Sequence, residues 1–200
     1  MACATDWTGF ARDDIGTAVT ALEDFSNFPK MADRTQQGFL NTLFLARLLR
    51  SSAGFASAPA FRVGGQSVLD GTVFYDGNSQ GGILGGAVTA ISNEWSRAVL
   101  GVPGMNYSTL LQRSVDFDTY KAILGPAYPS ELDRMLDFSI VQMLWDRAEA
   151  NGYAAHMTSL VVLVYGFEAK VGLCHGWILT PQAAHAPPRP AAGMGSSRSR

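Results

Sequence analysis

A serine between two glycines, in Gly77-Asn78-Ser79-Gln80-Gly81, is the segment of the sequence best suited to chemistry. In a G-x-S-x-G pattern the serine occupies a sharp, strained turn that lifts its hydroxyl above the edge of a sheet. A serine held in this way attacks a carbonyl carbon when a histidine takes its proton and backbone N–H groups stabilise the developing oxyanion. The pattern therefore predicts a nucleophile at Ser79 and one oxyanion donor at the backbone N–H of Gln80.

The segments on either side of Ser79 have the character that such a turn requires. Residues 71–76 are β-branched and aromatic, which predicts a strand. Residues 83–91 predict a helix whose small residues indicate close packing against a sheet. The positive end of this helix points at Ser79, where it favours an oxyanion. The strand–turn–helix order supports a pattern that, by itself, occurs by chance in many sequences.

The similarity to a known family is wider than these five residues. Residues 75–82 (YDGNSQGG) and 101–104 (GVPG) resemble the lipase and esterase side of the α/β-hydrolase superfamily. Residues 4–9 (ATDWTG) are similar to the segment before the first large helix of such enzymes, and the resemblance covers residues 2–166. It implies an α/β fold with a parallel sheet flanked by helices. It also implies a helical cap at about 105–155, and hydrolysis of a carboxylic ester through an acyl-enzyme on Ser79.

The acid and the base of such a hydrolase stay open at the level of sequence. In the family, the acid follows the strand after the cap and the histidine comes one strand later. Here a strand predicted at 160–165 is followed by Glu168 and then by His175. The first hypothesis is therefore a compressed triad of Ser79, Glu168 and His175, in the order nucleophile, acid, base.

Two further hypotheses remain. In the second, His156 is the base and Asp133 or Asp137 is the acid, in a rearranged cap. In the third, the acid and histidine are absent, because the reading frame is truncated and ends in a foreign or shifted tail. The pattern is lost after about Ser159, which favours the third hypothesis. The family also has two strands and an oxyanion loop before the segment at 4–9, so the resemblance implies an incomplete hydrolase at both ends.

The remaining segments divide the chain into a hydrolase-like domain at 1–176 and an Ala/Pro/Arg-rich tail at 177–200, which is expected to be disordered. Strands are predicted at 2–7 and 97–102, and the first of them is expected to be an exposed edge that favours homo-oligomers. Helices are predicted after Asp13-Asp14 and at 32–49, the latter with an apolar stripe of Phe39, Leu40, Leu43, Phe44 and Leu48. Aromatic and methionine side chains within 105–145 fit either a helical core or a cap over an acyl-binding pocket: Met105, Tyr107, Phe117, Tyr120, Tyr128, Met135, Phe138, Met143 and Trp145.

Composition narrows the class of partner. The formal net charge is −2 and charged residues make up 16% of the chain, which argues against a nucleic-acid partner. No apolar run is long enough for a membrane span, and no signal peptide is recognised, so a cytoplasmic location is expected. No Cys/His cluster has zinc spacing, and no metal or cofactor is expected. The predicted partner is a small ester substrate; the alternative is a truncated, non-catalytic hydrolase-like domain that binds apolar ligands.

Overall fold

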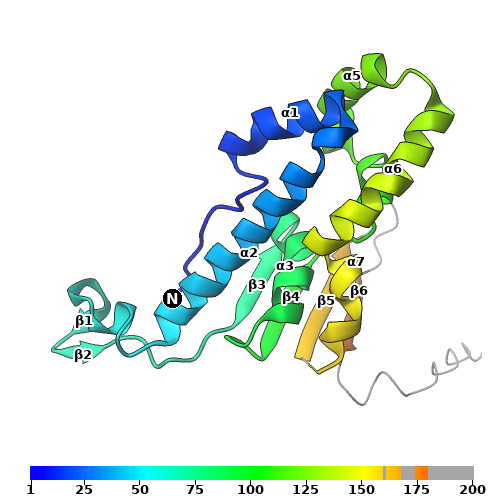
Figure 1. The fold of residues 1–200 in the computed structure, drawn as a ribbon. Coiled ribbons are helices and arrows are strands. Elements are labelled where there is room, and N and C mark those ends of the chain that lie inside the picture. Colours follow the sequence, from blue (N-terminus) through cyan, green and yellow to red (C-terminus); the bar gives the residue numbers. More distant parts are fainter. Residues whose placement is uncertain (160, 168–173, 180–200) are drawn as a thin grey trace, which may run out of the picture.

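A computed structural model describes residues 1–159, 161–167 and 174–179 of the chain (Figure 1). The described part contains both helices and strands. The helices are α1 (Ile15–Glu23), α2 (Pro29–Arg50), α3 (Gln80–Ile91), α4 (Tyr107–Leu111), α5 (Asp118–Ala127), α6 (Glu131–Trp145) and α7 (Ala150–Tyr153). The strands are β1 (Arg62–Val63), β2 (Gln66–Ser67), β3 (Tyr75–Asn78), β4 (Arg97–Gly101), β5 (Val161–Phe167) and β6 (Cys174–Leu179). The chain is therefore a mixed α/β protein.

The larger of the two described sheets has four strands in the order β3-β4-β5-β6. Strands β3, β4 and β5 are parallel, as expected. Strand β6 pairs antiparallel with β5, so the expectation of a wholly parallel sheet is wrong at this strand. The antiparallel direction follows from the short connection, because a parallel strand needs a crossover of a dozen or more residues.

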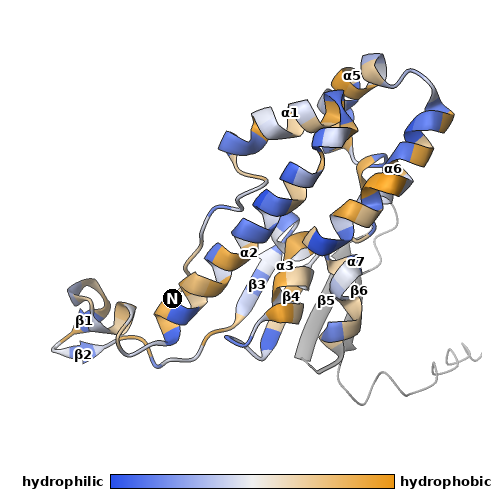
Figure 2. Cartoon of the chain, viewed as in Figure 1, coloured by the Kyte–Doolittle hydropathy of each residue, from blue (hydrophilic) through white to orange (hydrophobic). Residues whose placement is uncertain are grey.

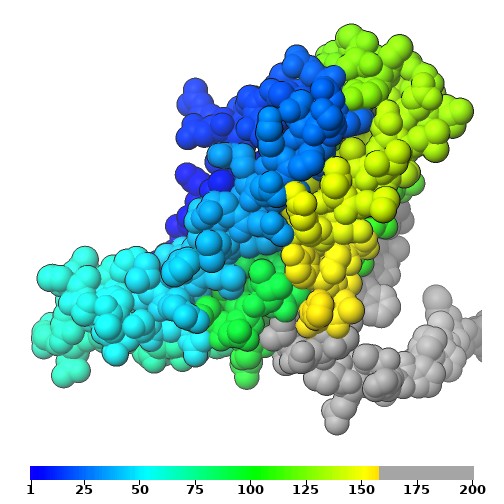
Figure 3. Space-filling view, viewed as in Figure 1, coloured from blue at the N-terminus to red at the C-terminus, as the bar shows by residue number. Residues whose placement is uncertain are grey.

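Helix α3 lies against β3 and β4, and α7 packs on α3. The chain leaves β4 at Gly101 and returns in β5 at Val161, and the segment between contains α4, α5, α6 and α7. The expected helical character of 105–155 is thus confirmed. In Figure 1, α1 and α5 lie together at the end of the molecule away from the sheet. The hairpin β1–β2 projects at the opposite end (Figure 3).

The strand predicted at 2–7 is wrong. Residues 1–7 form no ladder with any described strand, and the chain turns at once, with the Phe10 N–H bonded to the Trp7 carbonyl. Trp7 instead packs edge-on against Phe39 of α2, at 6.1 Å between ring centroids. The edge strands of the described four-stranded sheet are β3 and β6, so the expectation of association through residues 2–7 loses its basis.

Helix α2 begins at Pro29, the first-turn position that proline favours, three residues before the predicted start. The predicted apolar stripe is buried only in part: Phe39 is buried as expected, whereas Leu40, Phe44 and Leu48 are exposed. The face that packs inward contains Met31, Ala32, Thr35, Gly38, Phe39 and Ala46.

Helix α6 also has an apolar exposed side, visible in Figure 2, formed by Leu132, Met135, Leu136, Ile140 and Met143. Its other side buries Phe138, Val141 and Trp145, which pack against α1, α2 and α5. Ser130 caps the helix, because its hydroxyl accepts a hydrogen bond from the Asp133 N–H.

Candidate active site

Ser79 occupies the turn between β3 and α3, with φ of 56° and ψ of −119°. A positive φ is uncommon outside glycine and indicates a strained backbone, of order 1–3 kcal/mol. The turn is held by a hydrogen bond of 3.0 Å from the Ser79 N–H to the Gly101 carbonyl at the end of β4. The Ser79 side chain is exposed to solvent. The strand–turn–helix setting predicted for this serine is confirmed.

Two glycines around the turn have no room for a side chain. A Cβ on Gly77 would lie 2.3 Å from the Gly81 carbonyl oxygen, and a Cβ on Gly82 would lie 2.2 Å from that of Gly101. Gly81, the second glycine of the pentapeptide, is not crowded: its nearest neighbour would be the Tyr75 hydroxyl at 3.7 Å. The close approach of α3 to β4 therefore depends on Gly82, one residue beyond the pattern.

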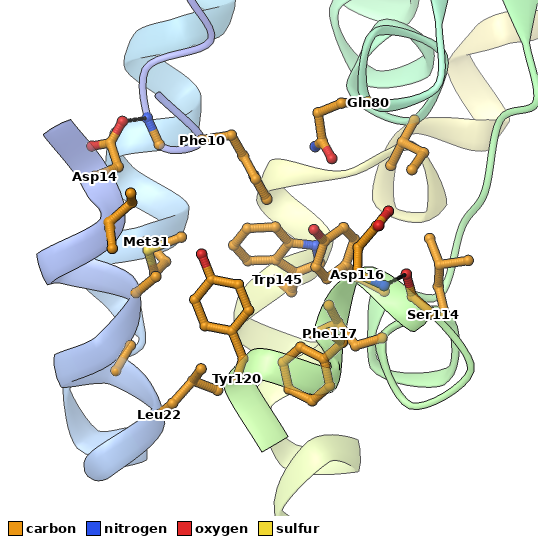
Figure 4. Close-up of a pocket in the computed structure, with 18 of the residues that line it drawn as sticks. Phe10, Asp14, Leu22, Met31, Gln80, Ser114, Asp116, Phe117, Tyr120 and Trp145 are labelled. Carbon is orange, nitrogen blue, oxygen red and sulfur yellow. Dashed lines mark hydrogen bonds between the residues drawn. The ribbon is translucent and has the colours of Figure 1, made fainter. Parts of the chain in front are cut away.

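A cavity of about 240 Å³ opens beside Ser79 (Figure 4). Ser79, Gln80 and Ile83 line it, and in Figure 4 Leu22, Phe117 and Tyr120 lie on the side away from Gln80. The walls are mostly apolar and come from five parts of the chain: the loop before α1, α1 itself, the start of α2, the stretch from α4 to the start of α5, and α6. They include Phe10, Ala18, Phe28, Met31, Leu110, Leu111 and Trp145.

The aromatic and methionine side chains of the helical segment divide into three groups. Tyr107, Phe117, Tyr120 and Trp145 line the cavity. Tyr128 and Phe138 pack in the neighbouring core. Met105, Met135 and Met143 are exposed and do neither.

Asp14 is the buried carboxylate of the cavity wall. It accepts hydrogen bonds from the Gly9 N–H at 2.6 Å and the Ala11 N–H at 3.1 Å, and it pairs with the Arg34 guanidinium. These bonds fix the loop that faces Ser79 across the cavity. A second carboxylate, Asp116, lies at the rim, whereas no Lys, Arg or His from the described residues lines the cavity.

A buried polar group connects the elbow to the helical segment. The Gln80 side chain faces the Tyr107 hydroxyl. The Nε2 of Gln80 is buried, and among the described residues no acceptor lies in good hydrogen-bond geometry to it. Burial raises the pKa of Tyr107, and the Glu149 carboxylate raises it further, so the phenol stays protonated. Glu149 accepts from the Tyr107 N–H at 3.2 and 3.1 Å and from Gln142, yet burial raises its pKa too.

The second buried donor of the cavity is the Trp145 indole N–H, which has no acceptor within the part of the chain that the structure describes. Buried N–H groups are normally paired with protein or water. The unpaired indole N–H of Trp145 therefore favours an occupant that has an oxygen atom.

The backbone around the cavity provides one clear oxyanion donor. Gln80 is the first residue of α3, so its N–H has no partner within the helix, and the helix dipole adds positive potential there. On the facing loop, the N–H groups of Gly9 and Ala11 bond to Asp14, and that of Phe10 bonds to Trp7. That loop does not present a free second donor.

The structure gives different information on the two triads predicted from sequence. Glu168 lies outside the described residues. His156 is exposed in the segment Ala154–Ser159 and does not line the cavity, and neither do Asp133 and Asp137 of α6. The structure therefore does not bring the members of the second predicted triad to Ser79.

His175 belongs to β6, of which the backbone is described. One row of paired residues crosses the sheet at the elbow end: Asn78, Gly101, Tyr165 and Gly176. Ser79 comes one residue after Asn78, and His175 comes one residue before Gly176. Because β6 runs antiparallel, both residues lie on the same side of that row. Their backbones are three strand spacings apart, roughly 14 Å. The register thus places His175 at the end of the sheet that holds Ser79.

Within the residues described, no group of three or more His, Cys, Asp or Glu side chains is arranged to hold a metal ion. No helix in that part of the chain is both long enough and apolar enough to cross a membrane. Comparisons of the chain with family models, with curated proteins and with solved structures gave no match.

Proposed function

We propose that the chain is a serine hydrolase of carboxylic esters, of the α/β-hydrolase type, with residues 105–155 as a helical cap. The observation that carries the proposal is the position of Ser79. It has a strained positive φ, it lies between a parallel strand and a helix, and it opens into an apolar cavity. Strain concentrates at functional sites when the surrounding structure imposes it. Gly77 and Gly82 make this turn possible, which supports a specific role for the strained serine.

In the proposed reaction, Ser79 Oγ attacks the ester carbonyl carbon and its proton passes to a histidine. The Gln80 N–H and the N-terminus of α3 stabilise the tetrahedral oxyanion. The alcohol then leaves with the proton, and water hydrolyses the acyl-enzyme by the same steps in reverse order. We assign this role to His175, because its strand β6 begins at the elbow end of the sheet, and Glu168 is then the acid. Three strand spacings exceed the combined reach of the two side chains, so the mechanism requires β6 and the elbow to approach each other.

The second candidate is a non-catalytic domain that binds apolar ligands in the same cavity. One observation favours it: among the described side chains, no histidine lines the cavity. The two candidates share the cavity and differ only in whether Ser79 reacts.

Covalent labelling combined with hydrolysis separates the two. An alkyl fluorophosphonate reacts with an activated serine, and mass spectrometry of the peptides locates the adduct. We expect one adduct at Ser79, together with hydrolysis of p-nitrophenyl octanoate that disappears in Ser79→Ala. Ser139→Ala, an exposed serine on α6, is the matched control and should keep the full rate.

The base is then identified with single variants of His156, His175 and His185. We expect His175→Ala to lower kcat by several orders of magnitude, whereas the other two keep it. If the folded protein gives no adduct and no hydrolysis, the non-catalytic binding domain is the better explanation. Full activity in all three histidine variants would contradict the triad mechanism.

A further inference from the structure

We infer that the cavity beside Ser79 takes an uncharged acyl chain of medium length, and that Leu22 of α1 limits that length. The inference rests on the proposed function for its meaning in catalysis. Its physical basis, the shape and charge of the cavity, is independent of whether Ser79 reacts.

Packed side chains line the end of the cavity away from Gln80. Leu22 and Phe117 both line it, and they are only 6% and 5% exposed. They belong to one cluster with Leu124 and Phe138, which joins α1 to α5 and α6. A chain that enters at Ser79 therefore ends against this cluster (Figure 4).

The volume sets the length. An apolar cavity of roughly 150 Å³ holds a benzene molecule, which has six carbon atoms. By the same proportion, the cavity of about 240 Å³ holds roughly ten carbon atoms. Acyl groups of about eight to ten carbons fill it, and longer chains have no room beyond Leu22.

The charge of the lining sets the second limit. Asp14 and Asp116 line the cavity, and no Lys, Arg or His among the described residues does so. The Arg34 guanidinium is already paired with Asp14. An anionic chain would enter an apolar space next to carboxylates with no free cation, which is strongly unfavourable. A neutral chain meets no such barrier.

Binding to the Ser79→Ala protein tests both limits without any need for catalysis. The probes are linear methyl ketones of 4 to 16 carbons, titrated in a calorimeter. We expect the affinity to rise about fourfold for each added methylene, as expected for burial of apolar surface, and to level off near ten carbons. Decanoate, which is anionic, should bind at least tenfold more weakly than 2-decanone.

Variants at Leu22 show whether this residue sets the limit. We expect Leu22→Ala to move the plateau to longer chains, and Leu22→Phe to move it to shorter ones. The opposite directions protect the test against a general loss of stability in either variant. Leu40→Ala removes an apolar side chain of the same size from the exposed side of α2 and should leave the plateau unchanged.

A plateau that stays fixed in both Leu22 variants, or an affinity that keeps rising to 16 carbons, would overturn the inference. Equal binding of decanoate and 2-decanone would overturn the charge limit. A plateau that moves as expected in a protein that hydrolyses no ester supports the inference and rejects the proposed catalysis. Ester hydrolysis whose rate does not depend on chain length supports the proposed catalysis and rejects the inference.

Discussion

The hydroxyl of Tyr75 donates a hydrogen bond of 2.6 Å to the carbonyl oxygen of Gly81. The bond spans the turn, because Tyr75 begins β3 and Gly81 is the second residue of α3. The ring stacks on Trp95 at 5.4 Å, and its burial, together with the nearby Asp76, raises the pKa of Tyr75. The phenol is therefore protonated at neutral pH and donates this hydrogen bond.

Tyr75→Phe removes this bond alone. We expect the free energy of unfolding to fall by about 1 kcal/mol, as is typical for one neutral hydrogen bond. Esterase activity should fall as well, because the strained turn loses a support. Urea denaturation and initial rates measure the two effects. Tyr153→Phe is the matched control, since its hydroxyl donates to the Arg147 carbonyl at 2.8 Å. A similar loss of activity in that control would remove the link to the turn.

Alanine at the glycines of the turn should have effects that differ by position. Gly77→Ala and Gly82→Ala place a Cβ against backbone oxygen, and we expect each to lower the free energy of unfolding by about 3 kcal/mol or more. Gly81→Ala meets only an ordinary contact and should fold normally. Gly16→Ala in α1, where nothing lies within 4 Å, should stabilise by about 0.5–1 kcal/mol. Thermal melts of the four variants check this order.

Ser79→Gly should be more stable than Ser79→Ala. Alanine keeps the strain of a positive φ, whereas glycine adopts this conformation freely. Glycine also gives the unfolded chain more conformational entropy, which offsets part of this gain. We therefore expect the free energies of unfolding of the two variants to differ by about 1 kcal/mol. Both variants lack the hydroxyl and should be inactive. Equal stability in chemical denaturation would show that the turn is not strained.

Glu149→Gln should change how stability depends on pH. Burial raises the pKa of Glu149 above its usual 4.5, so in that range the folded state binds more protons than the unfolded state. This carboxyl group therefore lowers stability as the pH rises from 4.5 through the folded pKa. We expect the slope of unfolding free energy against pH to be less negative in Glu149→Gln. Glu131→Gln, an exposed carboxylate on α6, gives the reference slope for removal of one surface carboxyl.

The turn itself could be predicted from the sequence, because strand propensity, glycine spacing and helix propensity all agree there. The ends of the helix that follows the turn could not be predicted from the sequence. Helix α3 begins at Gln80 rather than at Ile83, even though Gly81 and Gly82 are poor helix formers. Contact with β4 through Gly82 outweighs that propensity, and this contact is visible only in three dimensions.

Helix α2 shows why an apolar stripe can mislead. Its spacing of Leu40, Phe44 and Leu48 predicts a buried face, yet the helix buries Thr35 and Gly38 instead. A Cβ on Gly38 would lie 2.6 Å from the Thr8 carbonyl oxygen. The small residue allows the loop before α1 to approach, and that long-range contact decides the rotation of the helix. The strand expected at 2–7 is wrong for a related reason, because a strand needs a partner that local sequence does not specify.

The connection between β4 and β5 has a further consequence. The two strands are neighbours, so the whole helical segment leaves the sheet and returns to the adjacent position. It contributes Phe117, Tyr120 and Trp145 to the cavity, whereas Ser79 belongs to the preceding turn. Changes within α4, α5 and α6 alter the lining of the cavity without touching the paired residues of β4 and β5. Selection can therefore reshape what the cavity accepts while Ser79 stays in place, and laboratory recombination of this one segment is a direct route to new ligand preferences.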